Sequence, residues 1–226
     1  MTGMTVFQRA RTTEQRAVRR RAILDTAAAM LAEMPVAEVT LNELSRRVGL
    51  AKSNVLRYFE SREAVLLELL ATAWGEWLAD LAGDLDRAVD PAAPVTRRGD
   101  QVAAAVAASL AARPVLCDLL SAQAAVLERN VSPDLAATYK RSTVAALADL
   151  GALLRRHLGE LSPDDAGRLA AATMVTAGAL WPQCQPSAAM LAAYEADPAL
   201  AALRIDFADA LREFLSIVVA GLLART

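Results

Sequence analysis

The 226-residue sequence has few of the residues from which enzymes build active sites. Its one histidine is His157, and its two cysteines, Cys117 and Cys184, lack the spacing of metal ligands. Neither a glycine-rich phosphate loop nor a nucleophile–base pair is evident, so we expect no catalytic residue, no metal and no cofactor. Two free thiols are typical of proteins in a reducing cytoplasm, where we expect this protein to act.

Long apolar runs are also missing. The longest nearly uncharged stretches, residues 102–112 and 169–183, are shorter than the roughly 20 residues of a transmembrane helix, and no apolar signal core follows Met1. Aromatic residues make up only 4% of the chain, whereas alanine, leucine, glutamate and arginine are abundant. This composition predicts an all-α protein without a membrane span, long enough for one large domain or two small ones.

Positive charge is scarce overall but concentrated at one end of the chain. The net charge is −2, yet residues 1–65 contain 11 Lys and Arg against 7 Asp and Glu, whereas residues 66–226 contain 13 against 19. A basic head on an acidic body indicates that an anionic partner binds at the N-terminal end. The run RAVRRR at residues 16–21 adds to this charge, although such runs are more often solvated helix faces than binding sites.

Two capping boxes predict the first two helices. Thr12 with Gln15 starts a helix whose apolar residues recur at helical spacing as far as residue 34. Thr40 with Glu43 starts a second, short helix. This helix ends at residue 48, and Gly49 follows it as the left-handed residue that commonly ends a helix.

The third predicted helix, residues 52–59, has one polar face. Val55 and Phe59 lie four residues apart and turn inward with Leu50. The polar and basic side chains are left outside: Lys52, Ser53, Asn54, Arg57 and Tyr58. A short capped helix, a glycine in the turn and a second helix of this kind form a helix-turn-helix, whose outer face can read the major groove. A long fourth helix capped by Ser61 follows, and a linker with two prolines lies at residues 90–94.

These residues also carry a family resemblance. Residues 39–70, VTLNELSRRVGLAKSNVLRYFESREAVLLELL, resemble the DNA-binding core of TetR-type transcriptional regulators. Leu56 stands where that family usually has a phosphate-contacting tyrosine, with Arg57 beside it to take over, and Ser53 stands where glycine is common. The resemblance implies that Thr40 and Arg62 hold phosphates while residues 52–57 face bases and backbone. The full set of expected DNA-binding residues is Thr40, Ser45, Lys52, Ser53, Asn54, Arg57, Tyr58 and Arg62.

The resemblance also implies a domain organisation. Residues 1–62 would form a three-helix DNA-binding domain, and residues 63–226 a larger helical domain that binds a ligand and dimerises through its last two long helices. The residues themselves agree, because the stripe from Phe207 to Leu222 is widened beyond one face by Ile217, Val219 and Leu223. A helix that is apolar over so much of its circumference requires cover on more than one side, which a second subunit would provide.

Apolar stripes at helical spacing run over residues 116–127 and 135–154, the second after a helix start at Ser132. A further helix starts at Ser162, and its small residues allow close helix approach. Polar or amphipathic side chains on these helices are candidates for a ligand pocket. They are Gln123, Tyr139, Thr143, Thr176 and Trp181. The alternative is that each is an ordinary core residue, hydrogen-bonded to the backbone or to its neighbours.

We therefore expect a homodimeric repressor that binds a palindromic double-stranded DNA operator and is released by a small hydrophobic ligand. One alternative is a DNA-binding regulator without any ligand. Another is an all-α carrier or enzyme that keeps a vestigial helix-turn-helix, although no catalytic constellation supports an enzyme.

Overall fold

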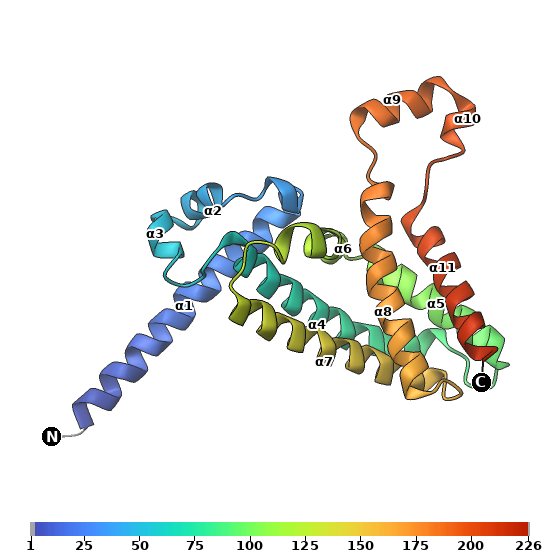
Figure 1. Ribbon diagram of the computed structural model, residues 1–226, viewed down its shortest axis with the longest axis horizontal. Coiled ribbons are helices and arrows are strands. Elements are labelled where there is room, and N and C mark those ends of the chain that lie inside the picture. The colour runs from blue at the N-terminus through green and yellow to red at the C-terminus, as the bar shows by residue number, and fades with distance from the viewer. Residues whose placement is uncertain (1–2, 226) are drawn as a thin grey trace. The chain divides into compact units, whose positions relative to one another are not determined.

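The structure is a computed structural model that describes residues 3–225, with side chains from residue 14 onward. It is 80% helical, and no strand occurs among the described residues. The predicted all-α fold is therefore confirmed (Figure 1). The chain divides into two compact units, and two of the boundaries between them fall inside long helices. Unit 1 extends to Leu69 and also includes Gln123–Ala136, and unit 2 contains the remaining residues.

Unit 1 contains the helix-turn-helix. Its elements are α1 (Gly3–Glu33), the 3₁₀ turn η1 (Val36–Glu38), α2 (Leu41–Val48), α3 (Lys52–Val55), the first turns of α4 (Arg62–Ala88), the π-helical turn η2 (Gln123–Leu127) and the first residues of α7 (Pro133–His157). Its fully covered apolar side chains include Ile23, Met30, Val39, Leu44, Val55, Val65 and Leu66. These residues pack the helix-turn-helix into one small core.

Two predicted helix boundaries in unit 1 are wrong. The first helix begins at Gly3 rather than at Thr12, because the residues between them include no proline and favour helix. The third helix is α-helical only over Lys52–Val55. Beyond it the bonds tighten to the i→i+3 pattern, in which Arg57 N donates to Asn54 O at 3.2 Å. The fourth helix starts as predicted, with Ser61 Oγ accepting from Ala64 N at 3.1 Å.

Unit 2 is built on close helix contacts. It contains the rest of α4, α5 (Val95–Ala111), α6 (Pro114–Ala122), most of α7, α8 (Pro163–Leu180), η3 (Trp181–Cys184), α9 (Ala188–Ala196), α10 (Pro198–Ala201) and α11 (Phe207–Leu223). α11 packs on α5 and α8, and α6 packs on α8. A Cβ added to Gly178 on α8 would lie 3.0 Å from Leu120 O on α6, so the small residues predicted in this helix do permit close approach.

Between α8 and α11 the chain makes an excursion through α9 and α10 (Figure 1). Neither helix has a buried residue, and Met190 and Leu203 are exposed. The predicted start of α8 is confirmed, since Ser162 Oγ accepts from Asp165 N at 3.1 Å. The sixth helix ends earlier than its apolar stripe predicts, because a π-helical turn replaces its last part.

Candidate nucleic-acid interface

The turn between α2 and α3 is fixed by backbone and capping bonds. Thr40 Oγ1 accepts from Glu43 N at 3.1 Å, which confirms the capping box at the start of α2. Gly49 has φ 71° and ψ 31°, the left-handed conformation expected of it. Leu50 N then donates to Ser45 O at 3.0 Å, so the chain is tied back to α2 before α3 begins. These bonds set the direction in which α3 leaves the turn.

α3 and the turn after it have one buried side and one exposed side. Val55 and Phe59 are buried, as predicted. Lys52, Ser53, Asn54 and Arg57 are exposed, and Tyr58 is half-buried. The polar residues are therefore on a surface that packing does not use, where their donors and acceptors are available to a partner.

Arginines elsewhere in the head are held by neighbouring carboxylates. Arg46 and Arg47 both bind Glu43, at 2.6 Å and 2.8 Å, and Arg47 also binds Glu33 at 2.6 Å. Hydrogen bonds from Arg46 and then Arg47 lower the pKa of Glu43 to about 2. Glu43 thus stays ionised at physiological pH, and the two cations on α2 are neutralised within the molecule.

Arg20 on α1 holds the end of the reading segment, by which we mean α3 and the turn after it, residues 52–59. Its Nη1 donates to Tyr58 O at 2.7 Å, and its Nε donates to Glu68 Oε1 on α4 at 3.2 Å. Its guanidinium also lies over the Phe59 ring, 4.1 Å from the ring centre. One side chain therefore joins α1, the turn after α3 and the start of α4. Residues of α1 were absent from the expected site, and the arginine run at residues 16–21 was their only signal.

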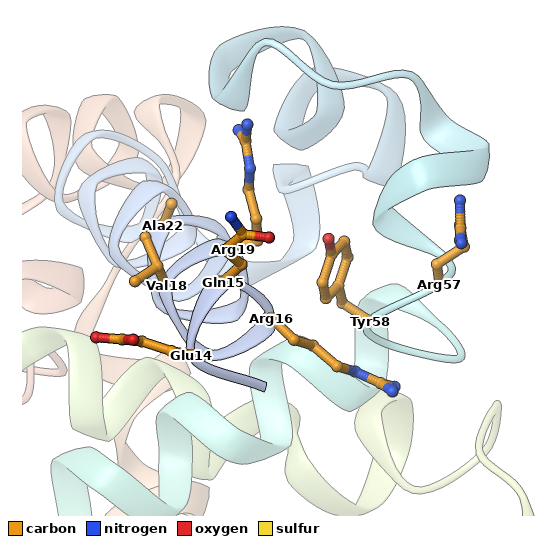
Figure 2. Close-up of a pocket in the computed structure, with 8 residues that line it drawn as sticks. All are labelled: Glu14, Gln15, Arg16, Val18, Arg19, Ala22, Arg57 and Tyr58. Atoms are coloured by element: carbon orange, nitrogen blue, oxygen red, sulfur yellow. The ribbon is translucent and has the colours of Figure 1, made fainter. Parts of the chain in front are cut away.

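A pocket of about 880 Å³ opens beside this junction. Figure 2 shows Arg16, Arg19 and neighbouring side chains of α1 on one side of it, with Arg57 and Tyr58 on the other. Glu14 is the only acidic residue among the eight that line it. The pocket is thus lined by three cations and lies directly beside the exposed face of α3.

The remaining expected DNA-binding residues lie elsewhere in unit 1. Thr40 is exposed, and its hydroxyl caps α2. Ser45 is only 6% exposed and donates its hydroxyl to Asn42 O at 2.8 Å. Arg62 donates to Val39 O at 2.8 Å and pairs with Glu63 at 3.1 Å, and in this conformation it holds the head together. Their contacts with DNA remain predictions.

The expected ligand residues are divided between the two units. In unit 1, Gln123 is buried in the π-helical turn and donates to Glu128 Oε1 at 2.9 Å. In unit 2, Tyr139 is buried, and Thr143 donates its hydroxyl to Tyr139 O at 3.1 Å. Trp181 stacks edge-on against Phe207, with the ring centres 5.1 Å apart. Thr176 is half-buried on α8. Whether these residues bind a ligand stays a prediction.

A second pocket, of about 600 Å³, lies in unit 2 between α5 and α11 and is lined by Arg97, Asp100, Gln101, Ala104, Arg212, Glu213, Ser216 and Ile217. None of the expected ligand residues lines it. Both cysteines are free thiols, as predicted, and burial raises the pKa of Cys117 to about 12. No group of three or more potential metal ligands occurs in the described part of the chain.

No single helix among residues 3–225 is both long and apolar enough to cross a membrane. The consecutive helical segments Val95–Ala111 and Pro114–Leu127, which are joined by a sharp bend, reach the necessary length and apolar composition only when they are taken together.

Protein-family models match both the N-terminal and the C-terminal part of the chain. Residues 23–69 match the protein-family model described as "Bacterial regulatory proteins, tetR family", and residues 71–226 match the one described as "Tetracyclin repressor-like, C-terminal domain". A comparison with curated proteins gives no match.

Solved structures with the same fold include a TetR transcriptional regulator from Rhodococcus sp. RHA1, with a TM-score of 0.56 at 14% identity over 93% of this chain and 97% of that one. The fatty acid degradation regulator FadR from Bacillus halodurans has a TM-score of 0.54 at 16% identity, over 89% and 98%. FadR from Bacillus subtilis, solved in complex with stearoyl-CoA, has a TM-score of 0.54 at 15% identity, over 89% and 98%.

Proposed function

Because the chain belongs to the TetR family of transcriptional regulators, we propose that it is a homodimeric repressor that leaves its DNA operator when a small hydrophobic molecule binds. The observation that carries the DNA-binding part is the exposed side of α3 and of the turn after it. Lys52, Asn54 and Arg57 project from a surface that the core does not use. Neither Lys52 nor Arg57 has an acidic partner among the described side chains, so both charges are available to DNA.

Single substitutions on this face test the proposal. Asn54→Ala and Arg57→Ala should each weaken operator binding by roughly 1–3 kcal/mol if the side chain makes a good base contact. Arg141→Ala is the matched control, because it removes one exposed positive charge from unit 2, far along the chain from the head. Fluorescence anisotropy with a labelled operator at physiological salt measures the effect. Undiminished binding by both head variants would show that α3 does not read the operator.

Apolar side chains on unit 2 support the dimer. On α11, Phe214 is 51% exposed and Ile217 is 64% exposed, whereas Leu211 and Leu215 on the same helix are buried. Val175 on α8 is also exposed. α11 thus has a second apolar stripe that α5 and α8 leave uncovered, and burial against an identical surface would remove it from water.

A charge on this stripe should separate the subunits. In a dimer interface Phe214→Asp would bury an unpaired carboxylate, which costs several kcal/mol, so we expect a monomer by multi-angle light scattering. Val144→Asp, at an exposed apolar residue of α7, is the matched control and should stay dimeric. Operator binding should fall with dissociation, because one head supplies half of the contacts. A folded Phe214→Asp dimer would place the interface elsewhere.

The ligand part rests on the buried polar groups of the expected pocket residues and on their apolar surroundings. The stripes that carry Gln123, Tyr139 and Thr143 include no Arg or Lys, which favours a neutral or weakly polar compound over a phosphorylated one. FadR from Bacillus subtilis was solved with stearoyl-CoA. Stearoyl-CoA and methyl stearate therefore make a useful pair of probes, since both have the acyl chain but only one has phosphates.

An effector must bind one state of the repressor more tightly than the other. Methyl stearate should quench tryptophan fluorescence, raise the melting temperature and release the operator over one concentration range. Tyr139→Phe or Gln123→Ala should change this response without changing operator affinity. Operator binding that no compound of this class affects would favour a regulator without a ligand.

A further inference from the structure

Two arginines on α1 differ from most of the other arginines of the head. Arg20 pairs with Glu68, and Arg21 pairs with Asp25 at 2.8 Å. The arginines of α2 and Arg62 are likewise bound to carboxylates. Arg16 and Arg19, by contrast, are exposed and have no ion pair within the part of the chain whose side chains are described. The head therefore leaves these two arginines available, as it does Lys52 and Arg57 on the other side of the turn.

The two arginines face the same pocket as a residue of the reading segment. Arg16 and Arg19 are three residues apart, so they are neighbours on one face of α1. Across the pocket lie Arg57 and Tyr58, whose phenol can donate a hydrogen bond (Figure 2). Three guanidinium groups around one open pocket repel one another, and Glu14 is the only acid that lines it. An anion would relieve this repulsion and could accept hydrogen bonds from several sides.

We propose that Arg16 and Arg19, together with Arg57, bind the phosphate backbone of the DNA beside the groove that α3 reads. This inference rests on the proposed DNA-binding function and extends its contact surface from the helix-turn-helix onto α1. Arg57 connects the two surfaces, because it lies in the exposed turn directly after α3 and also lines the pocket. A duplex engaged by that face brings a strand of closely spaced phosphates past Arg57, and the neighbouring phosphates then lie nearest to α1.

Contacts of this kind have a distinct signature. They fix the position of the protein on the duplex but carry no base information, so they strengthen operator and unrelated DNA alike. Each phosphate contact releases condensed counterions and adds about 0.9 to the slope of log K against log salt. Arginines that face only solvent would change that slope no more than any other single charge of the protein does.

The test compares single-charge variants of one helix. Arg16→Gln and Arg19→Gln should each reduce the salt slope by about 1, and the double variant should lose roughly 10- to 50-fold in affinity at 0.15 M salt. The loss should be equal for the operator and for unrelated duplex, leaving their ratio unchanged. Arg21→Gln is the matched control, because it removes the same charge from the same helix but from an arginine that is paired with Asp25. Its slope should stay close to that of the unmodified protein.

Fluorescence anisotropy between 50 and 300 mM salt gives all the slopes, and melting temperatures check that the variants fold. An unchanged salt slope in the double variant, or an equal fall of the slope in Arg21→Gln, would overturn this inference. The proposed function would still hold in that case, provided that the unmodified protein binds its operator sequence-specifically. Inorganic phosphate provides a further arm. If it raises the melting temperature of the unmodified protein but not of the double variant, while DNA binding is equal in both, the pocket takes a small anion and the inference is wrong. Failure of the unmodified protein to bind duplex DNA would overturn both proposals.

Discussion

Replacing Arg20 by methionine should loosen the end of the reading segment without disturbing the rest of the protein. The guanidinium donates to Tyr58 O at 2.7 Å and to Glu68 Oε1 at 3.2 Å, and it stacks 4.1 Å from the Phe59 ring centre. Methionine keeps most of the apolar stem that packs along α1 but removes every donor. The change therefore isolates the polar tether between α1, the turn after α3 and α4.

The three contacts give the expected magnitude. The charge-assisted bond to the half-buried Tyr58 carbonyl contributes about 1–1.5 kcal/mol. The stacking on Phe59 adds about 0.5–1 kcal/mol. The ion pair joins side chains that are 42% and 33% exposed, so solvent screening leaves it about 0.5–1 kcal/mol. Contacts that share one side chain are not additive, and we expect a total loss of about 2–3 kcal/mol.

Hydrogen exchange of the peptide that contains residues 52–59 measures this loss where it occurs. A loss of 2–3 kcal/mol corresponds to roughly a 30- to 160-fold fall in amide protection. Arg21→Met is the matched control, because its ion pair with Asp25 is exposed on both sides and should contribute under about 1 kcal/mol. A change below threefold in Arg20→Met, or an equal change in the control, would refute the tether as the element that orders this segment.

Three further changes test other parts of the structure. Ser109→Ala removes the hydroxyl that accepts from the buried Trp77 indole N–H at 2.9 Å. The free energy of unfolding, measured with urea and tryptophan fluorescence, should fall by roughly 1–3 kcal/mol. A loss under about 0.5 kcal/mol would mean that the indole finds another partner. Gly49→Ala places a side chain at φ 71° and should destabilise the head by about 1–2 kcal/mol, measured by exchange in α2, and no loss there would argue against the left-handed turn. Burial lowers the pKa of His157 below its usual 6.5 despite the attraction of Asp86, so the folded state binds fewer protons than the unfolded one. The contribution of neutral His157 to the free energy of unfolding is complete above pH 6.5 and is lost as the pH falls through the folded pKa. His157→Asn should therefore flatten the pH dependence of the free energy of unfolding between pH 7 and pH 5, and an unchanged slope would contradict this assignment.

Local signals in the sequence predicted the helix-turn-helix well. The capping box at Thr40, the left-handed Gly49 and the inward pair Val55 and Phe59 are all confirmed. Each depends on neighbours within one or two helical turns, and spacing along the chain therefore reveals it. The two wrong boundaries, at the start of α1 and the end of α3, also depend on local bonding. At both places favourable helix propensity competes with weak stop signals, so the last turns are hard to assign.

The contacts that assemble the site depend on residues far apart in the chain. Arg20 meets Glu68 across 48 residues, and Ser132 bonds to Glu60 across 72 residues, with Ser132 N donating at 2.6 Å. The sequence predicted Ser132 as the start of a helix, which Leu135 N confirms by donating to its hydroxyl at 3.3 Å, but it contained no sign of the second partner. The arginine run looked like one solvated face, because spacing cannot tell which arginine finds a carboxylate.

Selection of duplexes from a random pool tests the central claim most directly. The unmodified protein at physiological salt is mixed with a pool of random double-stranded DNA, and the retained duplexes are sequenced over successive rounds. A homodimer of helix-turn-helix heads predicts enrichment of an inverted repeat, with half-site centres about 10–10.5 base pairs, or a multiple of that distance, apart. Asn54→Ala should reduce enrichment at particular positions of each half-site. Retained DNA that shows no enriched sequence after repeated rounds, or no retention at all, would contradict the account.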